Sequence, residues 1–297
     1  MERDKRVVLI TGASRGLGLA VAKTLIERGR YRLVLTAREA SLSRFAEAGI
    51  VPSDDVGLCS LDVARHEERE AVVEYAAERF GGVDVLINNA GTMTRAVVEH
   101  VSDADHLRQM RVNYHGPMEL SRLCLPGMRE RGRGHIINVS SVGGMMAMPT
   151  MSVYSASKFA LEGASEALYY EVRPWNVFVT LVEPGFIDSG AIERVVYTDR
   201  SRAAAENPHS PYHAHYANMA VFIAQIMRRT PSTPTSVART ILRVLDKKCP
   251  PLRVAGTLDA RIFSILRRIL PRGLYHEVLY RALPQVASWG PRTKTKK

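Results

Sequence analysis

The residues best suited to chemistry in this sequence are a tyrosine and a lysine four positions apart. Tyr154 and Lys158 stand in the stretch VYSASK, at the start of a segment with helical periodicity. This spacing places the phenol and the ammonium on one face of a helix. A nearby cation favours the phenolate, which lowers the pKa of a tyrosine from about 10 toward the range of a general acid or base. The pair therefore predicts proton transfer to or from a substrate.

Other polar residues upstream strengthen this prediction, because a tyrosine–lysine pair alone often arises by chance. An apolar run of strand length, residues 134–139, leads into Ser140 and Ser141, and Asn113 falls in a helical segment before it. We therefore interpret these residues, together with Tyr154 and Lys158, as one catalytic group.

A glycine-rich turn near the N-terminus predicts a dinucleotide site. The apolar run VVLI leads directly into TGASRGLG (11–18), and a segment with helical apolar periodicity follows. Glycine lets the backbone approach a pyrophosphate closely, while the N-terminus of the next helix offers unpaired N–H groups and the positive end of its dipole. The strand–turn–helix context makes this prediction more specific than the glycines alone would.

Position 38 indicates which dinucleotide to expect. Twenty positions beyond Gly18, where an acidic residue would hold the ribose 2′-hydroxyl of NAD, the chain has Arg38. Its guanidinium, helped by Arg15 in the turn, can pair with the 2′-phosphate of NADP. We therefore expect NADP(H) to be preferred over NAD(H). The alternative is that Arg38 is only a solvated charge.

The elements that position these residues predict a doubly wound α/β Rossmann fold with a seven-stranded parallel sheet. Runs of strand length alternate with amphipathic helical segments, as in repeated βαβ units, and the glycine-rich turn favours this fold over a barrel. The expected helices include residues 17–28, 67–80, 117–130 and 152–172. The expected strands are residues 6–10, 32–36, 56–60, 83–88, 134–139, 177–182 and 252–255.

Length and composition fit one catalytic domain with an appendage. An apolar fraction of 46% in 297 residues can bury a full core. We expect a single domain over residues 1–256, with a proline-containing lid at about 190–235, and an extension over residues 257–297.

Three widely spaced cysteines without a CxxC pair favour a reducing, cytoplasmic location. We expect neither a signal peptide nor a spanning helix.

The chain resembles the short-chain dehydrogenase/reductase family over about residues 5–256. Around the serine and the tyrosine it is similar to 17β-hydroxysteroid and retinol dehydrogenases. The resemblance is carried, in chain order, by TGASRGLG (11–18), LDV (61–63), NNAG (88–91), Asn113, Ser141, Tyr154 with Lys158, and PGFIDS (184–189).

This resemblance implies roles for four catalytic residues. Tyr154 would exchange a proton with the substrate oxygen, while Lys158 would hold the nicotinamide ribose and lower the pKa of Tyr154. Ser141 would hydrogen-bond the substrate oxygen, since the family's serine lies thirteen positions before its tyrosine. Asn113 would maintain a local helix distortion and an ordered water.

The resemblance also implies the contacts to the cofactor. Asp62 and Val63 would clamp the adenine, and residues 89–91 would lie under the adenosine ribose. Ile187 and Ser189 would bind the carboxamide, although the family commonly has threonine at position 189. The residues expected to bind the cofactor are Gly12, Ser14, Arg15, Gly16, Leu17, Gly18, Arg38, Asp62, Val63, Asn89, Ala90, Gly91, Tyr154, Lys158, Pro184, Gly185, Ile187 and Ser189.

An apolar wall is expected around the substrate. Four methionines fall among residues 145–151, close to Ser141, and such side chains adapt to bulky apolar ligands. Ordinary core or dimer contacts are the alternative for some of them. With aromatic residues of the lid, they favour a steroid, retinoid, fatty-acyl or polyketide-like substrate. The residues expected to touch it are Ser141, Met145, Met148, Phe186, Tyr212 and Tyr216.

No metal is expected. The histidines at positions 209, 213 and 215 have no accompanying acidic or thiol ligand, and a polar loop explains them more simply.

The net charge of +11 is concentrated at the C-terminus. Residues 250–297 carry 10 basic and 2 acidic side chains, against 31 and 28 in residues 1–249. Residues 258–270 and 274–283 have the periodicity of basic amphipathic helices, which predicts peripheral membrane contact through residues 257–283. Packing over the cleft or against a second subunit is the alternative.

Nucleic acid is not expected as a partner, because the segment lacks a stacking platform. The habit of the family implies a homo-oligomer.

These observations predict an NADP(H)-dependent oxidoreductase that transfers hydride between nicotinamide and a hydrophobic ketone, aldehyde or alcohol, with Tyr154 as general acid/base. One alternative is a non-catalytic NADP(H)-binding sensor or scaffold, although such a protein has no need of all four catalytic residues. Another is an epimerase or dehydratase on the same fold.

Overall fold

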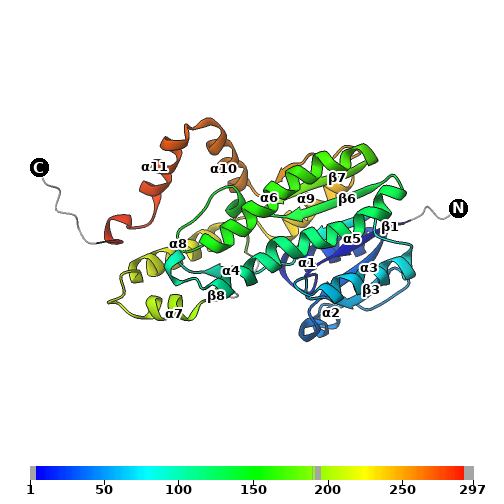
Figure 1. Cartoon of the computed structure of the whole chain (residues 1–297), viewed down its shortest axis with the longest axis horizontal. Coiled ribbons are helices and arrows are strands. Elements are labelled where there is room, and N and C mark those ends of the chain that lie inside the picture. The colour runs from blue at the N-terminus through cyan, green and yellow to red at the C-terminus, as the bar shows by residue number, and fades with distance from the viewer. Residues whose placement is uncertain (1–4, 189, 191–194, 291–297) are drawn as a thin grey trace, which may run out of the picture.

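A seven-stranded parallel sheet forms the centre of the molecule, as the computed structural model shows for residues 5–188, 190 and 195–290 (Figure 1). The strand order is β3-β2-β1-β4-β6-β7-β9, and every pairing in this sheet is parallel. The doubly wound Rossmann fold predicted from the sequence is thus confirmed. The strands are β1 (Arg6–Ile10), β2 (Tyr31–Ala37), β3 (Val56–Ser60), β4 (Val85–Asn88), β6 (Gly134–Val139), β7 (Val177–Glu183) and β9 (Arg253–Ala255).

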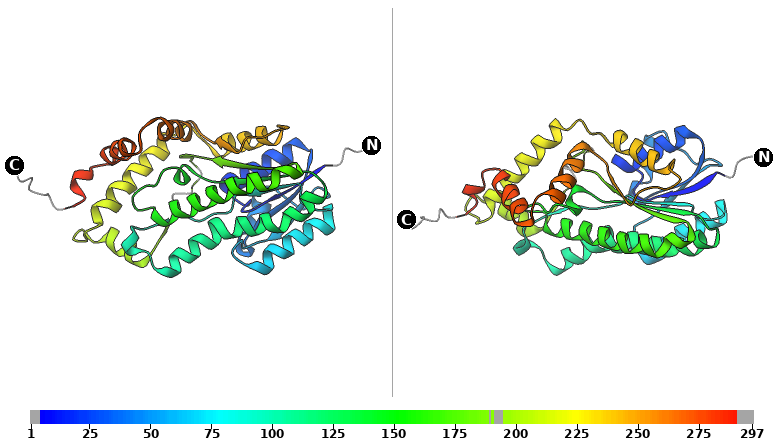
Figure 2. Two further views of the ribbon diagram at one scale, coloured as in Figure 1. Left: turned by 45° about the horizontal axis from the view of Figure 1, so that its top comes forward. Right: turned by 90° about the horizontal axis from the view of Figure 1, so that it is seen from above.

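Helices cover both faces of the sheet (Figure 2). On one face α1 (Gly16–Arg28) packs against α9 (Pro234–Leu245), with α2 (Ser43–Glu47) nearby. On the other, α5 (Gly116–Glu130) lies between α3 (His66–Phe80) and α6 (Ser152–Val172).

Each face of the sheet has its own apolar core. Val8 and Ile10 belong to the core beneath α1 and α9, whereas Leu9 belongs to the core beneath α3, α5 and α6. Successive side chains of a strand point to opposite faces, so a strand buried on both sides must be continuously apolar. This requirement accounts for the unbroken run VVLI.

The chain order reverses between β1 and β4, and a crevice forms there at the carboxyl ends of the strands.

Smaller elements lie beyond this crevice. A two-stranded parallel sheet joins β5 (Thr94–Arg95) to β8 (Val196–Tyr197), which the sequence analysis missed because each strand has only two residues. The lid region contains α7 (Asp199–Glu206) and α8 (His213–Arg229), and α4 (Asp103–Met110) precedes α5. Short 3₁₀ turns cover Glu39–Ser41, Val98–His100, Val142–Gly144, Arg173–Trp175 and Val286–Ser288.

Two further helices follow β9 and extend away from the sheet (Figure 1). They are α10 (Leu258–Ile269) and α11 (Arg272–Ala282). Phe263 of α10 and Leu279 of α11 pack against a small apolar cluster that includes Met145 and Met146. Within the described part of the chain, every helix is too short or too polar to span a bilayer.

Candidate active site

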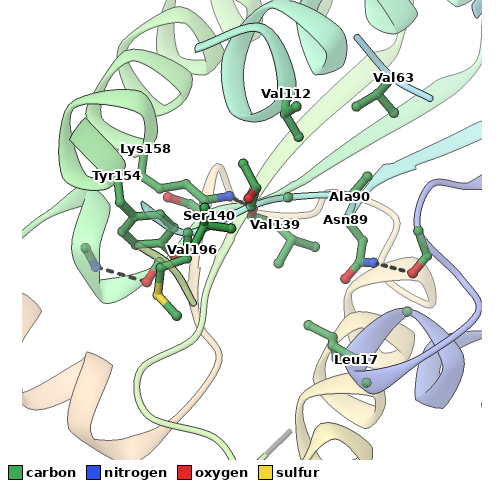
Figure 3. A pocket seen from close by; sticks show the side chains of 18 of the residues that line it. Leu17, Val63, Asn89, Ala90, Val112, Val139, Ser140, Tyr154, Lys158 and Val196 are labelled. Atoms are coloured by element: carbon green, nitrogen blue, oxygen red, sulfur yellow. Dashed lines mark hydrogen bonds between the residues drawn. The ribbon is translucent and has the colours of Figure 1, made fainter. Parts of the chain in front are cut away.

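A cleft of about 980 Å³ lies at the carboxyl ends of the central strands. Figure 3 shows Tyr154 and Lys158 on one side of it and Leu17, Asn89 and Ala90 on the other. Ser189 falls outside the described residues. The cleft wall includes the following residues that the sequence analysis singled out: Gly12, Ser14, Arg15, Gly16, Leu17, Gly18, Arg38, Asp62, Val63, Asn89, Ala90, Gly91, Ser141, Met148, Tyr154, Lys158, Pro184, Gly185, Phe186 and Ile187.

The glycine-rich turn is fixed against the turn that follows β4. Thr11 Oγ1 accepts hydrogen bonds from the N–H groups of Asn89 (3.0 Å) and Ala90 (2.9 Å), and Asn89 Nδ2 donates to the carbonyls of Thr11 (2.9 Å) and Gly12 (3.1 Å). A Cβ atom at Gly18 would lie 2.2 Å from the Gly12 carbonyl oxygen, so position 18 has no room for a side chain. Gly12 has φ +64°, which glycine adopts without strain. This close-packed turn at the start of α1 suits a pyrophosphate.

The catalytic side chains converge at the end of β6. Lys158 Nζ donates to the Val139 carbonyl over 2.8 Å, and the side chains of Tyr154 and Ser141 both lie beside Gly143. The N–H of Gly143 donates to Ser141 Oγ over 3.0 Å. A Cβ atom at Gly143 would lie 2.9 Å from the Tyr154 ring, so the glycine lets the ring approach this backbone. The phenol, hydroxyl and ammonium predicted to act together are therefore neighbours.

Burial shifts the pKa values of both titrating groups. It lowers the pKa of Lys158 to about 8, with Glu162 acting in the opposite direction. It raises the pKa of Tyr154, opposed by the hydrogen bond with Ser141. The spacing of Tyr154 and Lys158 predicted the opposite direction for the tyrosine. Desolvation of the phenolate outweighs that effect in the structure.

Asn113 lies in a distorted turn between two helices. Residues Arg111–His115 form a π-helical turn between α4 and α5, and Asn113 is fully buried there. Its Nδ2 donates to the Thr92 carbonyl (2.9 Å) and to Ser157 Oγ (3.0 Å), while its Oδ1 accepts from the Thr92 N–H (2.9 Å). Asn113 thus joins the segment after β4 to α6, one residue from Lys158.

A charged cluster that the sequence analysis missed lies behind the catalytic residues. Ser140 Oγ donates to Glu162 Oε1 over 2.6 Å, and Glu162 pairs with Arg253 over 2.6 Å. Arg253 also pairs with Glu183 and, over 2.7 Å, with Glu166. The cluster ties α6, β7 and β9 together beneath the site. The signal in the sequence was Glu162, four positions after Lys158 and so on the same helical face.

The start of α10 supports the cofactor-side loop after β7. The N–H of Gly185 donates to Thr257 Oγ1 over 2.8 Å, and the N–H of Phe186 donates to Asp259 Oδ2 over 2.8 Å. The expected division of the chain at residue 256 remains a prediction. These bonds nevertheless make the first turn of α10 part of the framework of the cleft.

Three residues expected to touch the substrate lie elsewhere. Met145 is buried in the cluster with Val142 and Met146, because its side chain packs toward the C-terminal helices. Tyr216 is buried, and its hydroxyl accepts from the Val97 N–H over 3.0 Å.

Tyr212 donates its hydroxyl to Glu99 over 2.6 Å, away from the cleft. The lid expected at about 190–235 includes α8, but the sequence did not show the direction in which the first turn of this helix faces. Residues of the substrate end of the cleft that the sequence analysis missed are Met93, Arg95, Val196, Ile223 and Met227, whereas Met151 belongs to the group of methionines expected there.

Comparisons with known proteins agree with this geometry. The family model described as "short chain dehydrogenase" matches residues 6–200. A 3-ketodihydrosphingosine reductase from Bacteroides thetaiotaomicron is 32% identical over 278 residues, which cover 92% of this chain and 96% of the relative. Human retinol dehydrogenase 8 is 32% identical over 302 residues, which cover 98% and 95%.

Solved structures share the fold. A short-chain dehydrogenase from Streptomyces avermitilis is 32% identical with a TM-score of 0.77, over 94% of this chain and 98% of that one. A short-chain dehydrogenase/reductase from Burkholderia phymatum, in complex with NAD, is 25% identical with a TM-score of 0.74, over 100% and 99%. A chain from Burkholderia cenocepacia, in complex with NADP, is 23% identical with a TM-score of 0.69, over 95% and 99%.

The buried ammonium of Lys158 gives the site a characteristic pH dependence of stability. Its pKa is about 8 in the folded protein but about 10.4 in an unfolded chain, so between these values the unfolded state binds more protons and stability rises with pH. In Lys158→Met this rise is absent. The free energy of unfolding of the variant minus that of the wild type should therefore decrease by up to about 3 kcal/mol from pH 7.5 to pH 10.5.

Denaturant unfolding of both proteins across this range measures the effect. Lys23→Met, which removes an exposed lysine of α1, serves as the control and should follow the wild type. A constant gap between Lys158→Met and wild type would contradict the assignment.

Proposed function

The chain belongs to the short-chain dehydrogenase family and is an oxidoreductase, and from this premise we propose that it transfers hydride between NADP(H) and a hydrophobic ketone, aldehyde or secondary alcohol. The observation that carries the proposal is one cleft with a glycine turn at one end and Tyr154, Ser141 and Lys158 at the other. The dinucleotide would lie along the turn, and its nicotinamide would supply or accept the hydride.

The chain's own residues orient the reacting oxygen and handle the proton. The side chains of Ser141 and Tyr154 are neighbours beside Gly143, so a carbonyl oxygen placed between their hydroxyls can accept from both. Because burial raises its pKa, Tyr154 keeps its proton at neutral pH and can deliver it to that oxygen during reduction. In oxidation Tyr154 would first lose its proton to solvent, and the phenolate oxygen would then receive the alcohol proton.

Replacing the acid tests this mechanism. Tyr154→Phe keeps the ring beside Gly143 but removes the proton donor, so we expect at least a hundredfold lower turnover with nearly unchanged cofactor affinity. NADPH oxidation with a panel of ketones and aldehydes of increasing apolar size gives the rate, and fluorescence titration gives the affinity. If the variant still turned over a substrate of the wild type, the result would contradict the mechanism. Tight NADPH binding without turnover across the panel would favour a sensor instead.

The arginines at the adenosine end support NADP(H). Arg38 is exposed at the cleft rim directly after β2, and Arg15 lines the same end. Among the described residues of the cleft wall, Asp62 is the one carboxylate, and it follows β3 rather than β2. A 2′-phosphate at the end of β2 would therefore meet positive charge. The solved neighbours include both an NAD and an NADP complex, so they do not decide the preference.

Cofactor affinities test this preference. We expect Arg38→Ala to raise the Kd for NADPH roughly 10-fold to 100-fold, the value of a lost charge-assisted hydrogen bond, and to leave the Kd for NADH nearly unchanged. Wild-type protein that binds NADH as tightly as NADPH would overturn the proposal. Lys23→Ala, on the exposed face of α1, controls for a general loss of positive charge.

The substrate end of the cleft supports an apolar substrate. Met148, Met151, Phe186, Ile223 and Met227 line it, which is the composition of sites for bulky hydrophobic ligands. The two relatives described above are named for reduction of a keto compound and dehydrogenation of retinol, which supports a ketone or an alcohol as the reacting group.

We also propose that α10 rests on an anionic lipid surface. Helical geometry puts its exposed apolar residues on one stripe, and Ala260 and Phe263, which face the protein, lie on the opposite side. The apolar side of this helix therefore points outward, bordered by the exposed Arg261 and Arg268. The stripe consists of Leu258, Ile262, Ile265, Leu266 and Ile269, between 38% and 71% exposed.

A second cavity lies beside this stripe and shares one lining residue with the cleft. Leu258 and Ile262 line this cavity of about 380 Å³ together with Phe222, Ile226 and Phe186. Phe186 also lines the catalytic cleft. An apolar substrate held in a lipid layer would thus meet this second cavity beside the catalytic cleft, with Phe186 between the two. The charge of residues 250–297 fits an anionic surface.

Vesicle flotation tests this docking. Full-length protein should float with vesicles that contain phosphatidylserine, and added salt should weaken the binding. The double variant Ile265→Glu with Ile269→Glu should lose it, whereas a control that places the same charges at the exposed Val51 and Val98 should not. Equal binding by both variants would contradict the proposal. A halved solution mass of the first variant would show that the stripe is a subunit interface.

A homo-oligomer remains a prediction. The exposed face of α6 that could serve as an interface is partly covered, because the Arg267 guanidinium lies over the Phe159 ring at 5.1 Å.

A further inference from the structure

Arg95 is a buried arginine in the wall of the catalytic cleft. It lies in β5, is only 3% exposed and lines the same cavity as Tyr154. Its Nη1 donates to the Tyr197 hydroxyl at 3.4 Å, a long hydrogen bond, and its guanidinium lies 6.0 Å from the centre of that ring. Its Nε is buried and has no hydrogen-bond acceptor within the described structure.

The strand geometry places Arg95 at the substrate end of the cleft. The next residue, Ala96, pairs with Met151, three positions before Tyr154 on the approach to α6. Arg15, by contrast, lies in the glycine turn, and Arg38 lies directly after β2, both at the adenosine end of the cleft. The neighbours of Arg95 in the cleft wall include Met93 and Val196, from the same two chain segments that form the small sheet. The guanidinium is therefore within the region that a substrate, rather than the cofactor phosphates, would fill.

A buried guanidinium without an anion is costly, and two other arginines of this chain meet carboxylates. Arg253 meets three of them, and Arg131 pairs with Asp84 over 3.4 Å. The buried Arg69, which does not line the cleft, donates to the Val63 carbonyl over 2.7 Å, although its Nε also lacks an acceptor within the described structure. Within the described part of the chain, Arg95 has no carboxylate within ion-pair distance. Its planar fork is suited to bidentate binding of a carboxylate or similar anion.

We propose that Arg95 binds an anionic group of the substrate, so that the preferred substrate is an apolar ketone or alcohol that also carries a carboxylate or a similar anion. The inference rests on the proposed function, since it concerns the same cleft. It narrows the substrate class, because a neutral ketone would leave Arg95 unpaired whereas an oxo acid would pair with it. Arg95 then determines specificity and takes no part in the proton transfer.

Matched pairs of oxo acids and their methyl esters test the proposal. A series of medium-chain oxo acids varies the distance from ketone to carboxylate, and each methyl ester removes the charge at the cost of one added methyl group. For at least one chain position, the wild type should reduce the acid with kcat/KM at least tenfold above the ester. In Arg95→Met this preference should disappear, mostly through KM, while the ester is still reduced. Arg95→Lys should restore part of it, and Arg122→Met, on the surface of α5, should behave as wild type.

Three results would overturn the assignment. The first is an equal rate for acid and ester throughout the series, and the second is a preference that survives in Arg95→Met. The third concerns Glu193, which is outside the described residues but close to β8 in the chain. If Arg95→Met loses thermal stability and the double variant with Glu193→Gln regains it, Glu193 is the partner of Arg95.

Failure of the proposed function gives a different result. If no ketone, charged or neutral, supports NADPH oxidation, hydride transfer is excluded for these substrates. Calorimetric titration of the oxo acids into the protein with NADP⁺ still tests Arg95, because the wild type should bind them at least tenfold more tightly than Arg95→Met does. Equal binding would overturn the assignment without reference to turnover.

Discussion

The burial of one ammonium group constrains the whole catalytic end of this molecule. Lys158 is held inside the protein by the carbonyl at the end of β6, and a buried cation needs compensation. Glu162, one turn further along α6, supplies negative charge, Arg253 of β9 balances Glu162, and Glu183 of β7 balances Arg253. Alternating charge thus runs from the active site to the edge of the sheet, and it fixes the relative positions of α6, β6, β7 and β9.

This arrangement also explains which parts of the site tolerate no side chain. A Cβ atom at Gly144 would lie 2.2 Å from Glu162 Oε1, and one at Gly185 would lie 1.9 Å from Asp259 Oδ2. Gly144 therefore makes room for Glu162, which accepts a hydrogen bond from Ser140. Gly185 makes room for Asp259, which accepts one from the N–H of Phe186. Ser140, which precedes the catalytic serine, and the loop after β7 are thus each held by a carboxylate that packs against a glycine backbone.

The sequence predicted the sheet closely because its signals are local. The bounds of β1 and β6 were found as observed because a short apolar run dominates each strand, although β6 also buries His135 and Asn138. The glycine turn identified its own context. Other features depend on tertiary packing and have no local signal. The two-residue strands β5 and β8 are too short for any periodicity, and the same periodicity that revealed α10 could not show that its apolar stripe faces outward. Tyr216 was misplaced for the same reason, and the direction of the pKa shift of Tyr154 depends on burial, which spacing does not report.

The position of β9 at the end of the sheet has a consequence for biosynthesis. Almost every group of the cleft wall is translated by residue 187, yet Arg253, Thr257 and Asp259, which fix the loop after β7 and the charges under α6, emerge some seventy residues later. Until then the nascent chain carries an unpaired edge on β7 and unbalanced carboxylates on α6 and β7. Because chains fold from the N-terminus as they are made, a ribosome-bound intermediate can have most of the dinucleotide pocket while its catalytic end is still open.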